Sequence, residues 1–187
     1  MYAYIKGSTG SKNFENHDIV KLGFWPGGDR DGNPFVTADI TRDVMNELRL
    51  TLMKCYYNDL KGLVHKLTFK DVQEPLQKLR GNLYTAMFDS SKDIGYEDLI
   101  VPLEEIQSIL IEKYQSLYLK DLEKFIDKVK IFKVHFATID IRQDHSMHTK
   151  VMVEVLKKNG FINDELSELS DEELLDILLH KNLNLVA

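Results

Sequence analysis

The sequence predicts a mainly α-helical fold that carries two short strands. Over most of the 187 residues, apolar side chains recur every three or four positions, which is the period of an amphipathic helix. Two stretches rich in β-branched and aromatic residues interrupt this period and are predicted to be strands. No internal repeat, low-complexity tract or clear linker divides the chain, so we predict a single domain over residues 1–187.

The first predicted strand covers residues 19–25. The residues before it, 1–17, contain turn-forming Gly and Ser, which favour a loosely structured beginning. Residues 26–34 follow the strand directly and contain three glycines and two prolines. Such a composition is compatible only with a loop.

The longest predicted helix begins after this loop. Thr37 is a suitable N-cap, and Asp39 lies in the first turn, where a negative charge is favourable. The apolar positions expected to face the core are Val44, Leu48, Leu52, Cys55, Tyr56, Leu60, Leu63 and Leu67.

Three further helices are predicted between this one and the second strand. Asp71 with Glu74 predicts a capping box for a helix that ends near Phe88. Pro102, followed by two glutamates, predicts the first turn of the next helix. A third helix is expected over residues 119–130.

The second strand is predicted within residues 130–141. Val134 and Phe136 alternate there with polar neighbours, and β-branched residues are frequent. A loop over residues 142–146 follows. Because two isolated strands do not form a stable sheet in water, they must pair with each other or with strands outside this chain.

Two helices are predicted after the second loop. The first begins near Met147 and ends at Asn159–Gly160, a common helix terminus. The last begins with a capping box made by Ser170 and Glu173.

The composition restricts the compartment and the partners. The formal net charge of −6 argues against nucleic acid or an anionic membrane as the main partner, but not against a small anionic substrate. Cys55 is the single cysteine, which rules out an intrachain disulfide, and we expect it to be buried. The absence of a signal-like start and of a membrane-spanning apolar run favours a reducing, cytoplasmic setting. The six histidines show no metal-site spacing.

The first loop fits no generic binding motif. A P-loop requires Lys and Ser or Thr where Asn33 and Pro34 follow the last glycine. A calcium-binding EF-hand loop requires Gly at Pro34 and Glu at Ile40. A plain turn explains the glycines but not the concentration of Trp25, Arg30 and aspartates. A purely structural interpretation, with capped turns and Arg30 in an ion pair, stays open at this point.

The second loop, residues 140–144, follows the carboxyl end of a predicted strand. In parallel α/β folds, substrates bind at that end of the strands. Arg142 is suited to a planar anion through paired hydrogen bonds. The alternative is a surface ion pair of Arg142 with Asp140 or Asp144.

Both loops resemble signatures of the phosphoenolpyruvate carboxylases. Residues 24–37, Phe-Trp-Pro-Gly-Gly-Asp-Arg-Asp-Gly-Asn-Pro-Phe-Val-Thr, are similar to the family's W-x-G-G-D-R-D-G-N-P-x-V-T. Residues 139–144 with His148 resemble its D-I-R-Q-E-S-x-x-H segment. The motifs occur in the family's order, and the resemblance spans residues 18–187. The sequence departs from the family at three positions: Pro26 replaces Met, Asp144 replaces Glu and His145 replaces Ser.

The resemblance implies a part of a large, mostly helical enzyme built on a (β/α)8 barrel and usually tetrameric. Residues 19–25 and 133–141 would be its first two, parallel, barrel strands. Such enzymes join phosphoenolpyruvate to bicarbonate with Mg²⁺ or Mn²⁺ and release oxaloacetate and phosphate. Of the barrel's chemistry, this chain would hold only two loops.

The resemblance also assigns roles to individual residues. Arg142 corresponds to an arginine that contacts the substrate phosphate, and Trp25 to a tryptophan that walls the apolar pocket near the enolate carbon. Supporting roles in shaping the loops and orienting Arg142 fall to Asp29, Arg30, Asp31, Asp140 and Gln143.

The family's remaining motifs are not found in this sequence. They include the T-H-P-T-E histidine, the metal-binding Glu and Asp, and the glycine-rich F-H-G-R-G-G loop. We therefore expect an internal fragment that binds no metal, is inactive alone and has the remainder of the enzyme as its partner. The alternative is a non-enzymatic helical interaction or scaffold module. Loops within about 10 Å of each other would favour the enzyme, and loops at opposite ends the module.

Overall fold

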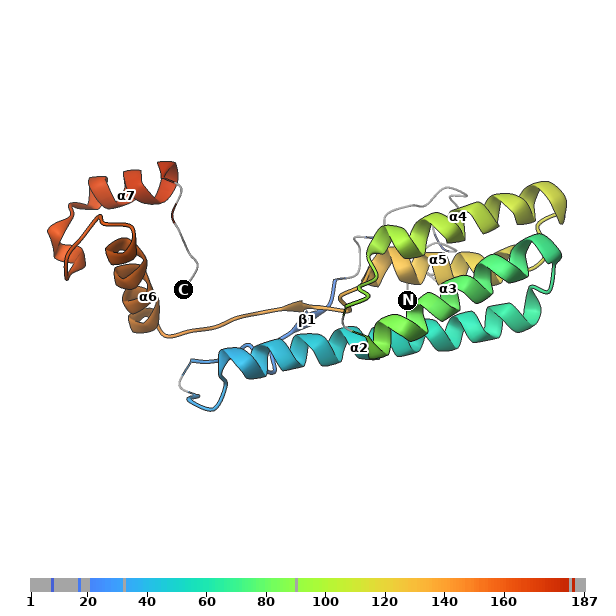
Figure 1. The fold of residues 1–187 in the computed structure, drawn as a ribbon, viewed down its shortest axis with the longest axis horizontal. Helices are drawn as coiled ribbons and strands as arrows, with labels where there is room; N and C mark the ends of the chain where they lie inside the picture. Colours follow the sequence, from blue (N-terminus) through green and yellow to red (C-terminus); the bar gives the residue numbers. More distant parts are fainter. Residues whose placement is uncertain are drawn as a thin grey trace. The chain divides into compact units, whose positions relative to one another are not determined.

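The computed structural model describes residues 8, 17, 21–31, 33–89, 91–181 and 183. Within these residues the fold is mainly helical with two short parallel strands, which confirms the predicted fold class (Figure 1). The chain forms two compact units: Met1–Gly27 with Ala38–Asp140, and Gly28–Thr37 with Ile141–Ala187. A single domain spanning the whole chain stays a prediction, and the predicted loose segment 1–17 lies almost entirely outside the described residues.

The first unit contains a bundle of α2 (Ala38–Lys66), α3 (Lys70–Phe88), α4 (Tyr96–Lys113) and α5 (Leu119–Phe132). Each helix packs against the next, and α2 also contacts α5, so the four helices enclose one core (Figure 1). None of the described helices combines the length and the apolar character needed to cross a membrane.

The long helix α2 buries the face that the sequence predicts, with one exception. Its second half places Leu52, Tyr56, Leu60 and Leu63 in the core, together with the following Leu67. Val44 and Leu48, in the first half, are partly buried.

The exception is Cys55, which was expected to be buried and is exposed. Met53 and Val64 complete the buried stripe on one side of Tyr56. At about 100° per residue, Cys55 lies on the opposite side of Tyr56 and faces away from the core.

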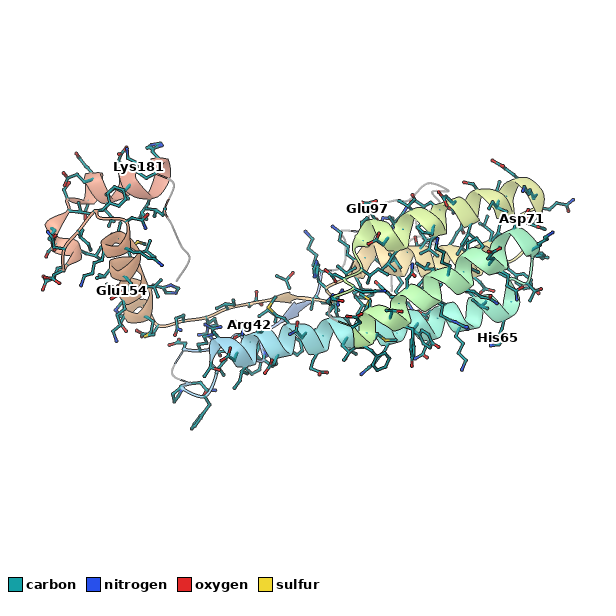
Figure 2. All side chains as sticks on the ribbon, in the orientation of Figure 1. Arg42, His65, Asp71, Glu97, Glu154 and Lys181 are labelled. Carbon is teal, nitrogen blue, oxygen red and sulfur yellow. The ribbon has the colours of Figure 1, made fainter. Side chains whose placement is uncertain are left out.

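The capping box predicted from Asp71 and Glu74 is wrong. Helix α3 begins one residue earlier than Asp71, at Lys70, and its N-cap, Phe69, makes no side-chain cap. The carboxylate of Asp71 instead accepts a hydrogen bond from Lys113 of α4 at 2.9 Å (Figure 2). A contact between helices therefore uses the carboxylate that sequence spacing assigns to a local cap.

The start predicted for the next helix at Pro102 is also wrong. Helix α4 begins at Tyr96, where the backbone N–H of Gly95 donates to Asp98 Oδ2 at 2.9 Å. Pro102 lies inside the helix, in its second turn. The cap by Asp98 and the burial of Leu99 and Ile100 outweigh the hydrogen bond that the proline lacks.

Both strands are shorter than predicted. Of the first, residues 19 and 20 lie outside the described residues, and β1 covers Gly23–Phe24. In place of a strand from residue 130, α5 extends to Phe132 and β2 covers Thr138–Ile139. The turn between α5 and β2 contains Lys133 and Phe136. Both residues have positive φ, which lies outside the range of a β-strand, so the strand cannot include them.

The same turn contributes to the core of the bundle. Val134 is buried, and Phe132 stacks on Phe136 with ring centroids 5.7 Å apart. Burial of these apolar side chains against the helices therefore outweighs the alternating pattern that predicts a strand.

In the second unit, α6 (His145–Lys158), the 3₁₀ helix η2 (Leu166–Glu168) and α7 (Asp171–His180) pack around a small core. Its buried residues are Leu156, Ile162 and Ile177. The predicted stop after α6 is confirmed, since Gly160 has φ of 74°.

The capping box predicted for α7 is confirmed. The Glu173 carboxylate accepts from the Ser170 N–H at 2.9 Å, and the Ser170 hydroxyl accepts from the Glu173 N–H at 3.3 Å.

Candidate functional site

The two strands that precede the loops pair with each other in parallel. Gly23 is paired with Thr138 and Phe24 with Ile139. The N–H of Thr138 donates to the carbonyl of Leu22 at 2.9 Å, and the N–H of Asp140 donates to that of Phe24 at 3.0 Å. Because parallel strands run in the same direction, both loops leave the pair at the same end.

The two loops then continue side by side in the second unit. Asp29 and Arg142 form a parallel bridge. The N–H of Arg142 donates to the carbonyl of Gly28 at 3.0 Å, and the N–H of Arg30 donates to the carbonyl of Arg142 at 2.9 Å. Loops that are more than one hundred residues apart in sequence are therefore in direct contact. This is the arrangement expected for one shared site rather than for two separate structural loops.

Arg142 lies between two carboxylates of the first loop. Its Nη1 is 3.5 Å from Asp29 Oδ2, and its Nη2 is 3.6 Å from Asp31 Oδ2. Short charge-assisted hydrogen bonds measure about 2.7–2.9 Å, so both contacts are looser than a closed pair. The Arg142 side chain is 65% exposed. The guanidinium is held in place and still presents donors to solvent.

The surface pairs considered from the sequence do not form among the described residues. Arg142 makes its ion pairs with Asp29 and Asp31 rather than with Asp140 or Asp144. The sequence motif contains both aspartates, but nothing in their spacing reveals that they reach across to the second loop.

Asp29 and Asp31 differ in their surroundings. The side chain of Asp29 is 27% exposed and that of Asp31 is 51% exposed. Asp29 Oδ1 is buried and, within the described part of the chain, accepts no hydrogen bond. Asp31 lies in a turn, closed by the Asn33 N–H donating to the Arg30 carbonyl at 3.4 Å.

The other predicted site residues belong to both units. Trp25 follows β1 in the first unit and is 65% exposed. Arg30 is partly buried. Asp140 bonds through its backbone to β1, as described above, and Gln143 Oε1 accepts from the Asp144 N–H at 3.1 Å. These hydrogen bonds of Asp140 and Gln143 shape the second loop and do not involve the Arg142 side chain.

Asp144, one of the departures from the family motif, caps helix α6. Its Oδ1 accepts from the Ser146 N–H at 2.8 Å. Hydrogen bonds from the Ser146 side chain and backbone hold the pKa of this carboxyl below its usual range. Asp is among the best N-cap residues, so Asp144 stabilises the start of the helix that follows the second loop.

Two residues that the sequence analysis did not single out, Thr41 and Gly27, fix the start of the first loop to α2. The Thr41 hydroxyl, which is buried, donates to the Gly27 carbonyl at 2.6 Å. Gly27 has φ of 80°, and a Cβ added there would lie 2.7 Å from Val44 Cγ2. A glycine is therefore required for both its conformation and its close approach to the helix.

Tyr56 of α2 holds the turn that precedes β2. It is fully buried, and its hydroxyl donates to the Lys133 carbonyl at 2.9 Å, in the turn that leads from α5 to β2. Burial, followed by the nearby Asp59 charge, raises the pKa of this phenol. The helical period correctly places Tyr56 in the core, but it cannot reveal the hydrogen bond.

Metal ligands do not cluster in the described residues. No group of three or more His, Cys, Asp or Glu side chains there could hold a metal ion. Asp29 and Asp31 face Arg142, whose positive charge would oppose a cation between them.

Comparison with known proteins gives one consistent result. The family model described as phosphoenolpyruvate carboxylase matches residues 1–94 and 87–185. The chain is 30% identical over 186 residues to the phosphoenolpyruvate carboxylase of Shewanella loihica, which covers 83% of this chain and 21% of that protein. It is 31% identical over 171 residues to that of Shewanella sediminis, and the match covers 75% of this chain and 20% of that protein. It is 27% identical over 190 residues to that of Aeromonas salmonicida, and the match covers 87% of this chain and 21% of that protein. The chain thus spans about a fifth of the length of these relatives.

Proposed function

Because the chain belongs to the phosphoenolpyruvate carboxylase family, we propose that it supplies two active-site loops to an enzyme that carboxylates phosphoenolpyruvate with bicarbonate. The products are oxaloacetate and inorganic phosphate. One observation carries the proposal: the two loops that bear the family motifs touch, and they hold an exposed arginine at their contact. A scaffold module would need neither feature.

Arg142 is the proposed phosphate-binding residue. In the reaction, a bicarbonate oxygen attacks phosphorus and the bond from phosphorus to the enol oxygen breaks. Carboxyphosphate and the enolate of pyruvate result; carboxyphosphate then loses phosphate, and the released CO₂ bonds to the enolate carbon. Negative charge lies on the phosphoryl oxygens throughout the first step. A guanidinium with open donors can bind two of these oxygens and stabilise that charge.

Trp25 is the proposed apolar wall. Its ring follows β1 and is largely exposed in this chain, which supports a surface that the rest of the enzyme covers. An indole next to the enolate carbon would exclude water, so the enolate meets CO₂ before it takes up a proton.

The remaining motif residues are proposed to support these two. Asp29 orients the guanidinium, Asp31 shapes the first loop, and Arg30 ties that loop to the Arg142 backbone. Asp140 and Gln143 shape the second loop on either side of Arg142. These contacts keep a flexible side chain near one position before the substrate arrives.

Other parts of the reaction fall outside this chain. Phosphoenolpyruvate carboxylases use Mg²⁺ or Mn²⁺, but the described residues do not offer a fitting set of ligands. The metal, further cations and the contacts of a tetramer would come from the remainder of the enzyme.

The first test replaces Arg142 in the full-length enzyme. We expect Arg142→Ala to lower kcat/KM for phosphoenolpyruvate by about tenfold or more, since a hydrogen bond to a charged group contributes about 1.5–3 kcal/mol. The matched control is Arg42→Ala, which removes an exposed arginine of α2 that pairs with Asp39 at 2.7 Å (Figure 2). Equal, small effects of both changes would favour the interaction module instead.

The second test uses the chain by itself. With phosphoenolpyruvate, bicarbonate and Mg²⁺, we expect the purified chain to form no oxaloacetate in an assay coupled to NADH oxidation. The physical reason is that two loops alone cannot neutralise the phosphate and stabilise the enolate. Measurable turnover would show that this chain carries a complete site.

A further inference from the structure

Asp31 has a position that the proposed reaction does not explain. It puts a negative charge 3.6 Å from the guanidinium that is proposed to receive a phosphate. A carboxylate near a bound dianion repels it, so a residue that served substrate binding alone would not be acidic. The arrangement instead resembles an occupied anion site in which the protein provides its own anion.

We propose that Asp31 is a resident counterion that competes with the substrate phosphate for Arg142, while Asp29 keeps the guanidinium oriented. The inference rests on the proposed function of the two loops, and it assigns different roles to two aspartates that the motif presents as equivalent. Neither residue is catalytic in this scheme; Asp29 is a positioning residue, and Asp31 sets the apparent affinity for the phosphate group.

Backbone pairing and burial make Asp29 the fixed partner. Its backbone is bridged to Arg142 itself, so its Cα stays beside that residue as long as the loops are in contact. Its Oδ2 faces the guanidinium, and Oδ1 is buried without a hydrogen bond among the described residues. Release of Arg142 would leave a largely buried carboxylate uncompensated, which is costly.

Exposure and a separate backbone turn make Asp31 the exchangeable partner. Its side chain is about half exposed and lies in the turn beyond the bridge. Water can therefore solvate the carboxylate when it leaves Arg142, so an exposed pair of this kind is weak. A phosphate dianion can take the place of Asp31 and bind the Nη2 donor that Asp31 faces.

The competition has a clear consequence for ligand discrimination. A weak or singly charged anion does not displace Asp31 readily, whereas a dianionic phosphate that binds through two oxygens does. Asp31 thus lowers the occupancy of Arg142 by common monoanions, at the expense of some affinity for the substrate.

The test is a double-mutant cycle in the full-length enzyme, with KM for phosphoenolpyruvate and kcat measured for each variant. We expect Asp31→Asn to lower KM about two- to fivefold, which is the scale of an exposed ion pair, and to leave kcat unchanged. We expect Asp29→Asn to lower kcat about tenfold, because the guanidinium loses its orientation. Competitive inhibition by inorganic phosphate should strengthen in Asp31→Asn by the same factor as KM falls. This agreement would show that Asp31 competes with the phosphate group of the substrate.

The cycle is completed by Arg142→Ala alone and together with Asp31→Asn. In the Arg142→Ala background, Asp31→Asn should no longer lower KM, because the competition needs the guanidinium. Asp39→Asn, an exposed aspartate of α2, is the charge-matched control and should change neither constant. Asp31→Ser provides a second neutral variant, and circular dichroism checks that each variant is folded.

The outcomes separate the two proposals. If Arg142→Ala leaves KM and phosphate inhibition unchanged, the proposed function of the loops is wrong. If Arg142→Ala impairs binding but both Asp31 variants leave KM unchanged or raise it, the function stands and the counterion role is overturned. An equal gain from Asp31→Asn with and without Arg142 also overturns it, since the effect would then be general electrostatics.

Discussion

At the scale of single residues, the contact between the loops depends on small and charged side chains with little tolerance for change. Gly27 lets the first loop pass close to Val44, and the Thr41 hydroxyl fixes its carbonyl. Asp29 and Asp31 then pair with the two Nη atoms of Arg142. Each of these residues has a physical reason to be what it is, independent of the family it belongs to.

Gly27→Ala is expected to destabilise the first unit by about 1–3 kcal/mol, because it forces a side chain into a positive φ and against Val44. Chemical denaturation followed by far-UV circular dichroism measures the change. Gly62→Ala is the matched control: Gly62 lies inside α2 with nothing within 4 Å of an added Cβ. There the same substitution should stabilise by about 0.5–1 kcal/mol. Equal effects at both positions would contradict the role given to Gly27.

At the scale of elements, the connection between α6 and α7 depends on one carboxylate. Glu168 accepts hydrogen bonds from the backbone N–H groups of Asn163, Asp164 and Glu165 at 2.8, 2.6 and 2.9 Å. These hydrogen bonds lower the pKa of Glu168 to about 2, and the bond from the Asn163 N–H makes the largest contribution. The sequence shows only an acidic stretch here, since the spacing does not reveal which carboxylate turns back on the loop.

This connection is expected to loosen in acid. Because the folded pKa is depressed, the Glu168 contribution is complete above the ordinary glutamate pKa of 4.5 and is lost as pH falls toward about 2. Amide chemical shifts of residues 163–165, followed by NMR between pH 7 and pH 2, should titrate in that window. In Glu168→Gln the component of this titration near pH 2 should disappear, whereas Glu154→Gln, an exposed residue of α6, should leave it intact (Figure 2).

The segment between α5 and β2 also belongs to this scale. Its alternating pattern predicts a long strand, but only Thr138–Ile139 is extended. Tyr56, from a helix more than seventy residues earlier, binds the Lys133 carbonyl, and the core takes up Val134. Long-range packing decides the local conformation here, which no local pattern can convey.

At the scale of the whole molecule, the two units differ in how much core they contain. Among the described residues, the first unit buries apolar side chains from all four helices of its bundle. The second unit buries Leu156, Ile162 and Ile177. Burial of apolar surface is the main favourable contribution to folding, so the two units should differ in stability.

Hydrogen exchange should resolve this difference. We expect the amides of α6 and α7 to exchange at a lower opening free energy than those of α2–α5, because fewer buried contacts oppose their local unfolding. Exchange monitored by mass spectrometry on the purified chain measures this, with peptides from each helix compared at one pH. Equal protection in both units would mean that they unfold together.

The sequence by itself determined the helical class, the last capping box, the core face of α2 and the family, through two motifs whose residue types no generic loop explains. Periodicity, caps and motifs are local properties, and local sequence is sufficient to express them. Only the tertiary structure decided that the strands are two residues long and pair with each other, that Cys55 faces outward and that Asp29 and Asp31 reach Arg142. Those features depend on which distant segments meet, and they follow from packing and charge between residues that sequence spacing keeps apart.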